Sequence, residues 1–280
     1  GLFFGPIADR LGYRLMMLTG MTLLVAGMFA GGLFPFYGVI LIALFLAGLG
    51  KSMFDPALQA YVSERVPFHR RGLAIGFLEF AWAGSTLLGI PLIAVLIDRM
   101  GWRAPFFVMG GLGILGFLAL SILVEKTAQK KAPGPSLPVF RGAWRQLLRE
   151  RAALGALSYS FWISVANDNL FVVYGAWLEK QFGLALGLGT AVIGIAELAG
   201  ESFTAALADR LGLKRALIGG LAACLICYGI LPLLGETLGM ALTGLFFLFL
   251  TFEFTIVTGL SLFTELVPAS RATMMASYLA

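Results

Sequence analysis

Gly5-Pro6-Ile7-Ala8-Asp9-Arg10-Leu11-Gly12-Tyr13-Arg14 is the stretch that decides the fold, because its core occurs twice in the chain. Ala8-Asp9-Arg10-Leu11-Gly12 returns as Ala208-Asp209-Arg210-Leu211-Gly212, displaced by 200 positions. A second match joins segments 64–70 and 265–271, which share Glu, Val, Pro and Arg and are displaced by 201 positions. A repeat this long indicates two copies of one structural unit and excludes small solenoid repeats.

The composition predicts a membrane protein. Hydrophobic residues make up 59% of the chain and charged residues 12%, whereas soluble domains contain roughly 25% charged residues. About 20 apolar residues cross a hydrocarbon layer of about 30 Å as a helix. Segments of this kind predict an all-α, polytopic fold with eight full spans: Leu15–Phe34, Phe36–Gly50 (extended to about Tyr61), Leu73–Ile97, Ala104–Val124, Ala152–Leu178, Leu184–Leu207, Ala216–Leu234 and Leu238–Phe263. Residues 1–8 and 272–280 are interpreted as two partial spans.

The positions of the basic residues predict the orientation of the spans. If the loop that holds Asp9 is cytoplasmic, alternation of the spans puts 16 of the 20 Lys and Arg residues inside and three outside, with Lys51 in a span. The inside set is Arg10, Arg14, Arg65, Arg70, Arg71, Lys126, Lys130, Lys131, Arg141, Arg145, Arg149, Arg151, Arg210, Lys214, Arg215 and Arg271. This asymmetry follows the positive-inside rule. It explains the net charge of +5 without a nucleic-acid partner.

The two Asp-Arg loops resemble the signature of the major facilitator superfamily of secondary transporters. Gly5-x3-Asp9-Arg10-x-Gly12-x-Arg14 is similar to its G-x3-D-R-x-G-x-R core, and the second copy has Ala205 in place of the first Gly. The resemblance implies two parallel six-helix halves with a substrate site between them near the membrane midplane. Within the family, the chain is most similar to the drug:proton antiporter and sugar-efflux permease branch.

The resemblance also implies an organisation along the chain. Residues 1–124 form an N-terminal half, residues 125–151 a cytoplasmic linker with an amphipathic helix, and residues 152–280 a C-terminal half. The chain then covers the end of helix 2 to the start of helix 11 of twelve, and lacks helix 1, most of helix 2 and most of helices 11 and 12. The basic and apolar faces of the linker helix predict contact with an anionic lipid surface.

We expect the repeated loops to form a cytoplasmic gate. Glycines permit tight turns and close approach, and the charged side chains can pair across the ends of neighbouring helices in one end-state of a rocking motion. A plain turn with positive-inside charges is the alternative. The gate set is Gly5, Asp9, Arg10, Gly12, Arg14, Asp209, Arg210, Gly212, Lys214 and Glu201; Glu201 is included because it can pair with Arg210.

The ionisable residues inside the spans predict the cavity. Lys51 and Asp55 lie four residues apart, so they can neutralise each other, or Lys51 can supply a cavity charge. Glu197 and Glu201 share one helix face, and three consecutive polar residues at 167–169 predict local unwinding or a water-filled neighbour. The candidate proton-coupling and cavity residues are Lys51, Asp55, Glu79, Asn167, Asp168, Asn169, Glu197 and Glu253.

The distribution of these residues agrees with the resemblance. All intramembrane ionisable residues fall on the spans that correspond to helices 4, 5, 7, 8 and 10, which line the family's cavity, and none on helices 3, 6 and 9. An intramembrane charge costs several kcal/mol unless it meets water or a partner. The run Gly84-x4-Gly89-Ile90-Pro91 is also similar to the antiporter motif of helix 5, with Ile90 inserted between Gly and Pro.

These patterns predict a proton-coupled secondary transporter that exports a small organic solute. We expect a monomeric, multi-pass protein of a prokaryotic plasma (inner) membrane, driven by a proton gradient, with no cofactor or metal. We expect no enzyme activity, because the sequence has no set of nucleophile, His and acid and no metal-ligand cluster. A nutrient importer or facilitator on the same fold, or a transport-inactive receptor or scaffold, are the alternatives.

Overall fold

The computed structural model describes residues 2–125, 137–183 and 186–279, and every regular element among them is a helix. Seven helical segments are long and apolar enough to cross a membrane: Tyr13–Leu33, Tyr37–Arg65, Phe68–Met100, Ala104–Leu123, Leu188–Leu211, Leu213–Leu234 and Leu238–Phe263. The predicted polytopic all-α fold is confirmed. The remaining predicted span, Ala152–Leu178, lies in a 32-residue helix, Arg151–Phe182, which has the length but is more polar because it carries Asn167, Asp168 and Asn169.

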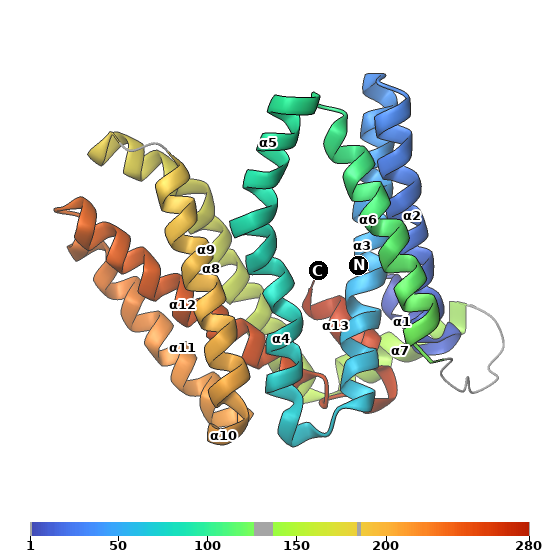
Figure 1. The fold of residues 1–280 in the computed structure, drawn as a ribbon. Helices are drawn as coiled ribbons and strands as arrows, with labels where there is room; N and C mark the ends of the chain where they lie inside the picture. The colour runs from blue at the N-terminus through green and yellow to red at the C-terminus, as the bar shows by residue number, and fades with distance from the viewer. Residues whose placement is uncertain (1, 126–136, 184–185, 280) are drawn as a thin grey trace. The chain divides into compact units, whose positions relative to one another are not determined.

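The described chain forms two compact units, each made of segments that are not consecutive in the sequence. Unit 1 comprises residues 1–65, 91–155 and 263–280, and unit 2 comprises residues 66–90 and 156–262. The units follow contacts, whereas the predicted halves 1–124 and 152–280 follow the sequence repeat, so the halves stay a prediction. The α-helices of unit 1, labelled in Figure 1, are α1 (Phe4–Leu11), α2 (Tyr13–Leu33), α3 (Tyr37–Arg65), α5 (Ile90–Met100), α6 (Ala104–Leu123), α7 (Leu137–Arg149) and α13 (Arg271–Tyr278). The short 3-10 helix η5 (Pro268–Ser270) precedes α13.

Small residues let the helices of unit 1 approach closely. α2 packs along α3 and α6. A Cβ atom at Gly20 of α2 would lie 2.6 Å from the carbonyl oxygen of Gly50 of α3, and a Cβ at Gly50 would meet the carbonyl oxygen of Gly20. Near the loop end of these helices, Met16, Met17 and Met53 form a buried cluster with small neighbours from α1 and α13. Helix association in a membrane relies on such contacts, because lipid is as apolar as the side chains.

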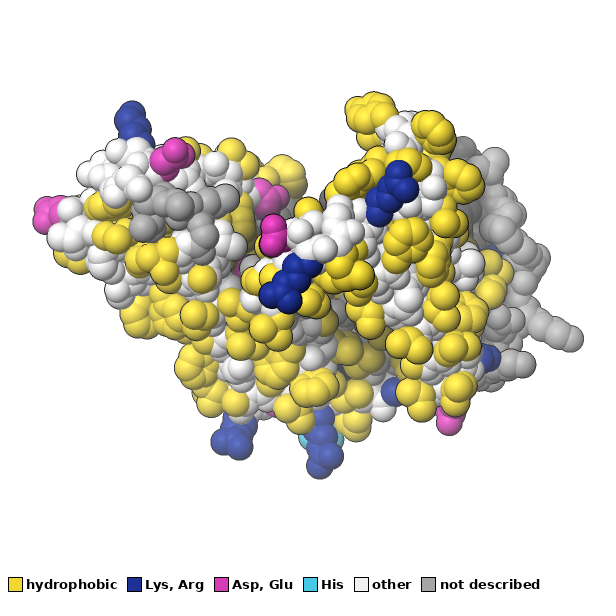
Figure 2. Space-filling model, turned by 45° about the horizontal axis from the view of Figure 1, so that its top comes forward, with side chains coloured by type: hydrophobic (Ala, Val, Ile, Leu, Met, Phe, Trp, Pro, Cys, Tyr) yellow, Lys and Arg dark blue, Asp and Glu magenta, His cyan; other side chains and the backbone are white. Residues whose placement is uncertain are grey.

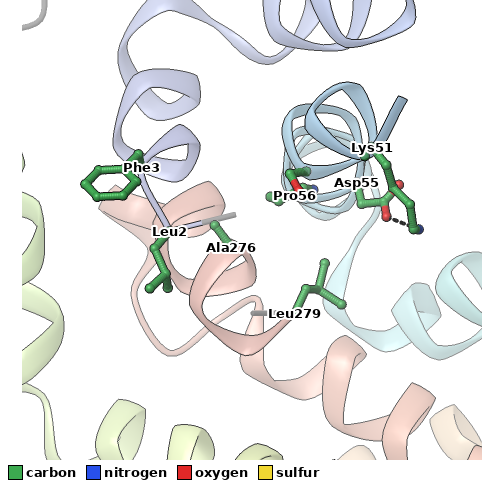
Figure 3. A pocket seen from close by; sticks show the side chains of 9 residues that line it. Leu2, Phe3, Lys51, Asp55, Pro56, Ala276 and Leu279 are labelled. Atoms are coloured by element: carbon green, nitrogen blue, oxygen red, sulfur yellow. Dashed lines mark hydrogen bonds and ion pairs between the residues drawn. The ribbon is translucent and has the colours of Figure 1, made fainter. Parts of the chain in front are cut away.

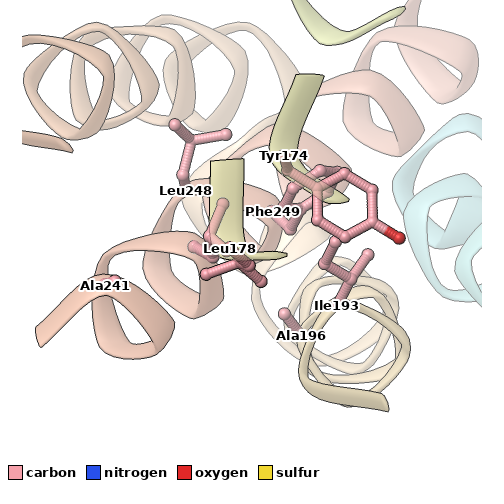
Figure 4. Close-up of a cluster of buried hydrophobic side chains, with 8 residues drawn as sticks. Tyr174, Leu178, Ile193, Ala196, Ala241, Leu248 and Phe249 are labelled. Atoms are coloured by element: carbon pink, nitrogen blue, oxygen red, sulfur yellow. The ribbon is translucent and has the colours of Figure 1, made fainter. Parts of the chain in front are cut away.

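Unit 2 combines α-helices and two π-helical turns around a core of mainly aliphatic side chains. Its elements are η1 (Phe68–Arg70), α4 (Arg71–Gly84), the π-helical η2 (Ser85–Gly89), α8 (Arg151–Phe182), α9 (Leu186–Phe203), the π-helical η3 (Thr204–Ala208), α10 (Asp209–Leu211), α11 (Leu213–Ile230), η4 (Leu231–Leu234) and α12 (Leu238–Phe263). Tyr174 and Leu178 of α8 pack against Ile193 of α9 and Phe249 of α12 (Figure 4). Phe249 also meets Phe171 edge to face, with ring centroids 5.0 Å apart.

The outward surfaces of the helices are apolar, as the lipid-facing surface of a membrane protein must be. Hydrophobic side chains cover most of the face shown in Figure 2. Ile122 of α6 and Val172 of α8 are 79% and 81% exposed. The chain is therefore a multi-pass integral membrane protein.

The described part of the linker forms the helix α7. Leu147 of α7 is completely buried, while Arg145, Leu148 and Arg149 are exposed. Gln146 accepts a hydrogen bond from the Ser270 hydroxyl, at 3.3 Å, just before α13. The linker helix thus buries Leu147 against the rest of unit 1, while Arg145 and Arg149 stay exposed. The side chains of residues 126–141 lie outside the described part, and lipid contact stays a prediction.

The contact between α2 and α3 predicts a position-specific loss of stability. Gly50→Ala places a methyl group against the Gly20 backbone, so we expect the free energy of unfolding to fall by about 1–3 kcal/mol, as for other overpacked sites. Thermal unfolding of the purified protein in detergent measures this change. Gly38→Ala in the same helix is the control, because its Cβ would meet nothing within 4 Å. Equal unfolding midpoints for the two variants would contradict the proposed packing.

Candidate functional site

Asp9 binds the beginning of a helix that lies far from it in the sequence. Its carboxylate accepts hydrogen bonds from the backbone N–H groups of Ala272 and Thr273, both at 2.9 Å. The hydroxyl groups of Thr273 and Tyr13 donate to it at 2.6 Å and 3.2 Å. The first N–H groups of a helix have no partner within the helix and carry partial positive charge. Asp9 therefore caps α13 and joins it to α1; we call this contact the α1–α13 clamp.

Asp209 makes the equivalent contact in unit 2. Its two carboxylate oxygens accept hydrogen bonds from the backbone N–H groups of Gly72 and Leu73, both at 2.9 Å. These residues form the first turn of α4. Gly72 has to be small here, because a Cβ atom on it would lie 2.9 Å from the Asp209 Oδ1 atom. We call this contact the α4–α10 clamp.

The two clamps differ in the number of hydrogen bonds that reach the carboxylate. Asp9 receives four, whereas the position equivalent to Thr273 is Leu73, which has no hydroxyl group. Burial raises the pKa of the Asp9 carboxyl, and the hydrogen bonds from Thr273, Ala272 and Tyr13 oppose that rise. The α1–α13 clamp is therefore the more extensively bonded of the two.

The clamps correct the register of the second sequence match. The sequence aligns segments 64–70 and 265–271 with a displacement of 201. In the structure Gly72 instead occupies the position equivalent to Ala272, and Leu73 the position equivalent to Thr273. The helices α4 and α13 begin at the equivalent residues Arg71 and Arg271. The structural displacement is therefore 200, the same as for Asp9 and Asp209. The arginines correspond as well, since each donates to a carbonyl group of the preceding loop: Arg71 to Val66 and Arg271 to Thr264.

Glycine forms the turn that follows each aspartate. Gly12 has a φ of 92° and Gly212 a φ of 81°, values that side chains with a Cβ atom disfavour. Each glycine separates two helices and lets the chain reverse direction within one residue. Gly12 and Gly212, which the sequence placed in the gate, are therefore needed for the backbone conformation of the turn.

A glycine and an alanine have exchanged places between the two clamps. A Cβ atom at Gly5 of α1 would lie 2.9 Å from the Cβ atom of Ala276 of α13. In unit 2 the first residue is Ala205, and the facing residue is Gly76, whose Cβ would lie 3.1 Å from that of Ala205. The departure of Ala205 from the sequence signature is thus offset by Gly76 on the partner helix.

The arginines and lysine of the loops have partners or surroundings different from those expected. Arg14 does not pair with an aspartate; it donates to the backbone carbonyl of Ser121 at 2.6 Å, in the last turn of α6. Arg10 is half-buried, and Arg210 and Lys214 are exposed. Asp9 is bound by helix N–H groups where charge pairing across helix ends was expected.

Four glutamates meet inside unit 2. Glu79 of α4, Glu197 and Glu201 of α9 and Glu253 of α12 are close enough to interact electrostatically. Their exposed fractions are 4% for Glu197, 0% for Glu201 and 6% for Glu253, and Glu79 is half-buried. The close approach of α9 and α12 makes this possible, because a Cβ atom at Gly200 would lie 2.8 Å from the Glu253 Cβ atom. We call these residues the glutamate cluster.

The three buried glutamates of the cluster have no basic counterpart among the described residues. No lysine or arginine of the described residues forms an ion pair with Glu197, Glu201 or Glu253, so the expected pairing of Glu201 with Arg210 is absent. The backbone of Ala83 interacts with Glu201, but no hydrogen bond of good geometry reaches either carboxylate oxygen. Burying uncompensated carboxylates costs several kcal/mol. A bound proton or a cation removes that cost.

Trp82 belongs to this site although the sequence analysis did not select it. Its side chain donates a hydrogen bond to the Glu197 carboxylate, and it is 50% exposed. Its position three residues after Glu79 could have indicated that Trp82 belongs to the site, because residues three apart share a helix face.

The polar triplet of α8 does not interrupt its helix. The structure has one continuous α-helix over Arg151–Phe182, so the predicted local unwinding is wrong. Asn169 donates to the carbonyl group of Val165 at 2.6 Å, one turn earlier, and Asp168 is exposed. Asn167 is buried, and its Oδ1 atom accepts no hydrogen bond. No interaction among the described residues joins Asp168 to the glutamate cluster.

The residue that disrupts the antiporter-like motif lies beside a π-helical turn. Ile90 follows η2, Ser85–Gly89, and a π turn holds one more residue than an α turn. Leu87 of η2 fits against Gly194 of α9, where a Cβ atom would lie 2.8 Å from its Cδ2 atom. The inserted residue is therefore accommodated locally, next to the glutamate cluster.

Lys51 and Asp55 form an ion pair on α3 in unit 1. Figure 3 shows the pair, whose side chains are 60% and 34% exposed, so both sequence alternatives for it stay open. Among the described residues, no group of three or more His, Cys, Asp or Glu side chains could hold a metal ion.

The chain matches known proteins over its whole length. A family model described as Major Facilitator Superfamily matches residues 1–280. An uncharacterized MFS-type transporter of Bacillus subtilis, YceJ, is 25% identical over an alignment of 280 positions that covers 96% of this chain and 69% of the relative. The multidrug resistance protein MdtG of Enterobacter lignolyticus is 27% identical over 225 residues, or 78% of this chain and 53% of the relative.

A solved structure has the same fold. The crystal structure of the human organic anion transporter MFSD10 superimposes with a TM-score of 0.70 at 17% identity, covering 98% of this chain and 70% of that one. At this identity the likeness concerns the fold alone.

The clamps predict local protection of two helix beginnings. Asp209→Ala removes the acceptor for Gly72 and Leu73, so we expect their amide hydrogens to exchange about tenfold faster or more, since a charge-assisted hydrogen bond contributes roughly 1.5–3 kcal/mol. Peptide-resolved hydrogen exchange measures this. The segment around 272–273 is the internal control and should respond only to Asp9→Ala. A uniform change in both segments would contradict two separate caps.

Proposed function

Because the chain belongs to the Major Facilitator Superfamily, we propose that it is a secondary transporter that moves a small organic solute across a membrane by alternating access. The proposed mode of transport is proton-coupled efflux. The multidrug-resistance relative is consistent with efflux. The bacterial relatives are consistent with the plasma membrane of a prokaryote, where the protein would act as a monomer.

The two clamps support alternating access. Each joins one helix of the predicted N-terminal half to one helix of the predicted C-terminal half: α1 to α13, and α4 to α10. Both contacts consist of a carboxylate and backbone N–H groups, which water can replace on either side at modest net cost. We propose that the clamps close the cytoplasmic side in one end-state and open in the other.

The single observation that carries proton coupling is the burial of Glu197, Glu201 and Glu253 without a basic partner among the described residues. A carboxylate in that position is costly when ionised and acceptable when it holds a proton. When alternating access admits water to the cluster, the ionised carboxylate becomes acceptable. The proton that was bound on one side of the membrane can then leave on the other. Glu197 is the best candidate for the proton-binding group that also responds to substrate, because the exposed Trp82 is bonded to it.

An importer or a facilitator on the same fold would use the clamps in the same way but would not need the cluster. A transport-inactive receptor would need neither. Flux measurements with the intact protein therefore separate the candidates.

Neutralising the cluster should uncouple transport from the proton gradient. In proteoliposomes screened with radiolabelled drugs, sugars and amino acids, we expect Glu197→Gln and Glu253→Gln to reduce pH-gradient-driven flux at least about tenfold, the usual scale for losing a proton-transfer group. Glu236→Gln, in an exposed loop of the same unit, should leave flux unchanged. Full flux in both cluster variants would refute their coupling role. No flux of any solute would favour the receptor.

A further inference from the structure

Glu201 is the most deeply buried member of the glutamate cluster. It is 0% exposed, and neither of its carboxylate oxygens, Oε1 or Oε2, has a hydrogen-bond partner of good geometry among the described residues. An ionised carboxylate without donors is strongly disfavoured in an apolar interior, whereas a protonated carboxyl group is tolerated there. The position of Glu201 therefore favours the form that holds a proton.

The nearby hydroxyl groups of the same helix are used elsewhere. Ser202 donates to the backbone carbonyl group one turn earlier, at 2.7 Å. The Thr204 hydroxyl lies 3.1 Å from the carbonyl oxygen of Gly200 and 3.2 Å from that of Phe254 on α12. A hydroxyl group has one proton to donate, and these two donate to backbone carbonyl groups. Neither hydroxyl therefore supplies a donor that would stabilise an ionised Glu201.

The titratable groups that face Glu201 from the surrounding helices are acidic. Glu79 of α4 and Glu197, one turn earlier on α9, interact electrostatically with it, and it interacts in the same way with Glu253 of α12. No lysine or arginine of the described residues forms an ion pair with Glu201. Because the side chain has no accessible surface, another basic group could reach it only if these helices separated. Like charges oppose ionisation in the same direction as burial does.

Glu197 has a donor of the kind that Glu201 lacks. The Trp82 side chain donates a hydrogen bond to its carboxylate, and Oε2 is the oxygen that has no partner. A hydrogen bond to a carboxylate stabilises the ionised form, so Glu197 is the easier of the two residues to ionise. Residues four positions apart lie on one helix face, and the Glu201 carboxyl group can therefore reach the Glu197 side chain.

We propose that Glu201 retains a proton while Glu197 exchanges one, which makes Glu201 a positioning residue of the coupling site. Its carboxyl O–H donates to Glu197 Oε2 and stabilises the ionised state of Glu197 after the exchanged proton has left. One hydrogen bond then gives a partner to an oxygen atom of each residue. That the proton of Glu197 is the transported one rests on the proposed function; the protonated state of Glu201 does not.

Infrared spectroscopy of the intact protein in lipid tests the proton on Glu201. Protonated carboxyl groups and carboxylates absorb at different frequencies, so the difference spectrum between wild type and Glu201→Gln identifies the form that the substitution removes. At neutral pH we expect the loss of a protonated-carboxyl band. Glu236→Gln, in an exposed loop of the same unit, is the matched control and should lose a carboxylate band. Loss of a carboxylate band in Glu201→Gln overturns the proposal.

The pH titration of Glu197 separates a positioning role from a structural one. Its carboxyl band is assigned with Glu197→Gln. Glu201→Met removes the O–H donor, so we expect Glu197 to titrate about one pH unit higher or more, because a hydrogen bond to a charged group changes a protonation equilibrium about tenfold or more. A structural role predicts an unchanged midpoint.

Glu201→Gln is the matched variant for this titration, because its amide N–H group keeps a donor at the same place. The proposal predicts the wild-type midpoint for Glu197 in this variant. If Glu201 were ionised in the wild type, the substitution would remove a neighbouring negative charge and lower the midpoint. A lower midpoint in Glu201→Gln, or an unchanged one in Glu201→Met, therefore refutes the proposal.

These outcomes are distinct from those of the proposed function. A protonated Glu201 and a raised Glu197 midpoint in Glu201→Met, without flux of any solute, support the positioning role and refute transport. Gradient-driven flux in the wild type together with a carboxylate band for Glu201 supports transport and refutes the positioning role.

Discussion

A carboxylate that accepts the first N–H groups of a helix is the interaction that organises this protein. Every helix begins with N–H groups that have no intrahelical partner, and at a membrane boundary these groups are costly to leave unsatisfied. Asp9 and Asp209 satisfy them for α13 and α4. Since each aspartate sits next to a glycine turn, it holds three helix ends together: its own helix, the next one and the one that it caps.

The chain's repeat made half of these contacts predictable. Asp9, Asp209 and the two glycine turns could be found from the sequence because the motif requires particular residue types. Their partners could not, because a backbone N–H group is present in every residue except proline. The exchange of glycine and alanine between Gly5–Ala276 and Ala205–Gly76 was hidden for a related reason: only the packed pair defines how much space is available.

The sequence identified each glutamate as a charge within a span, but it did not predict that the four side chains come together. Hydropathy identifies a charge within a span, but bringing Glu197 and Glu201 against Glu253 requires the contact of Gly200 with α12. The opposite error occurred in α8. Three polar residues in a row suggested a broken helix, but Asn169 bonds to a carbonyl group of its own helix, so the backbone did not have to open. The overall fold followed from composition, since lipid permits few alternatives to helices.

The π turn before Pro91 also preserves the direction in which side chains point around the helix axis. In a regular helix an inserted residue rotates every later side chain by about 100° around the axis, so the residues after the insertion would face another direction. Because η2 holds the additional residue within a single wide turn, the side chains of α4 before it and of α5 after it keep their directions independently of each other. Two stretches of one continuous span can thus accept substitutions separately: α4 is constrained by its contacts with α9 and η3, whereas α5 has no buried residue.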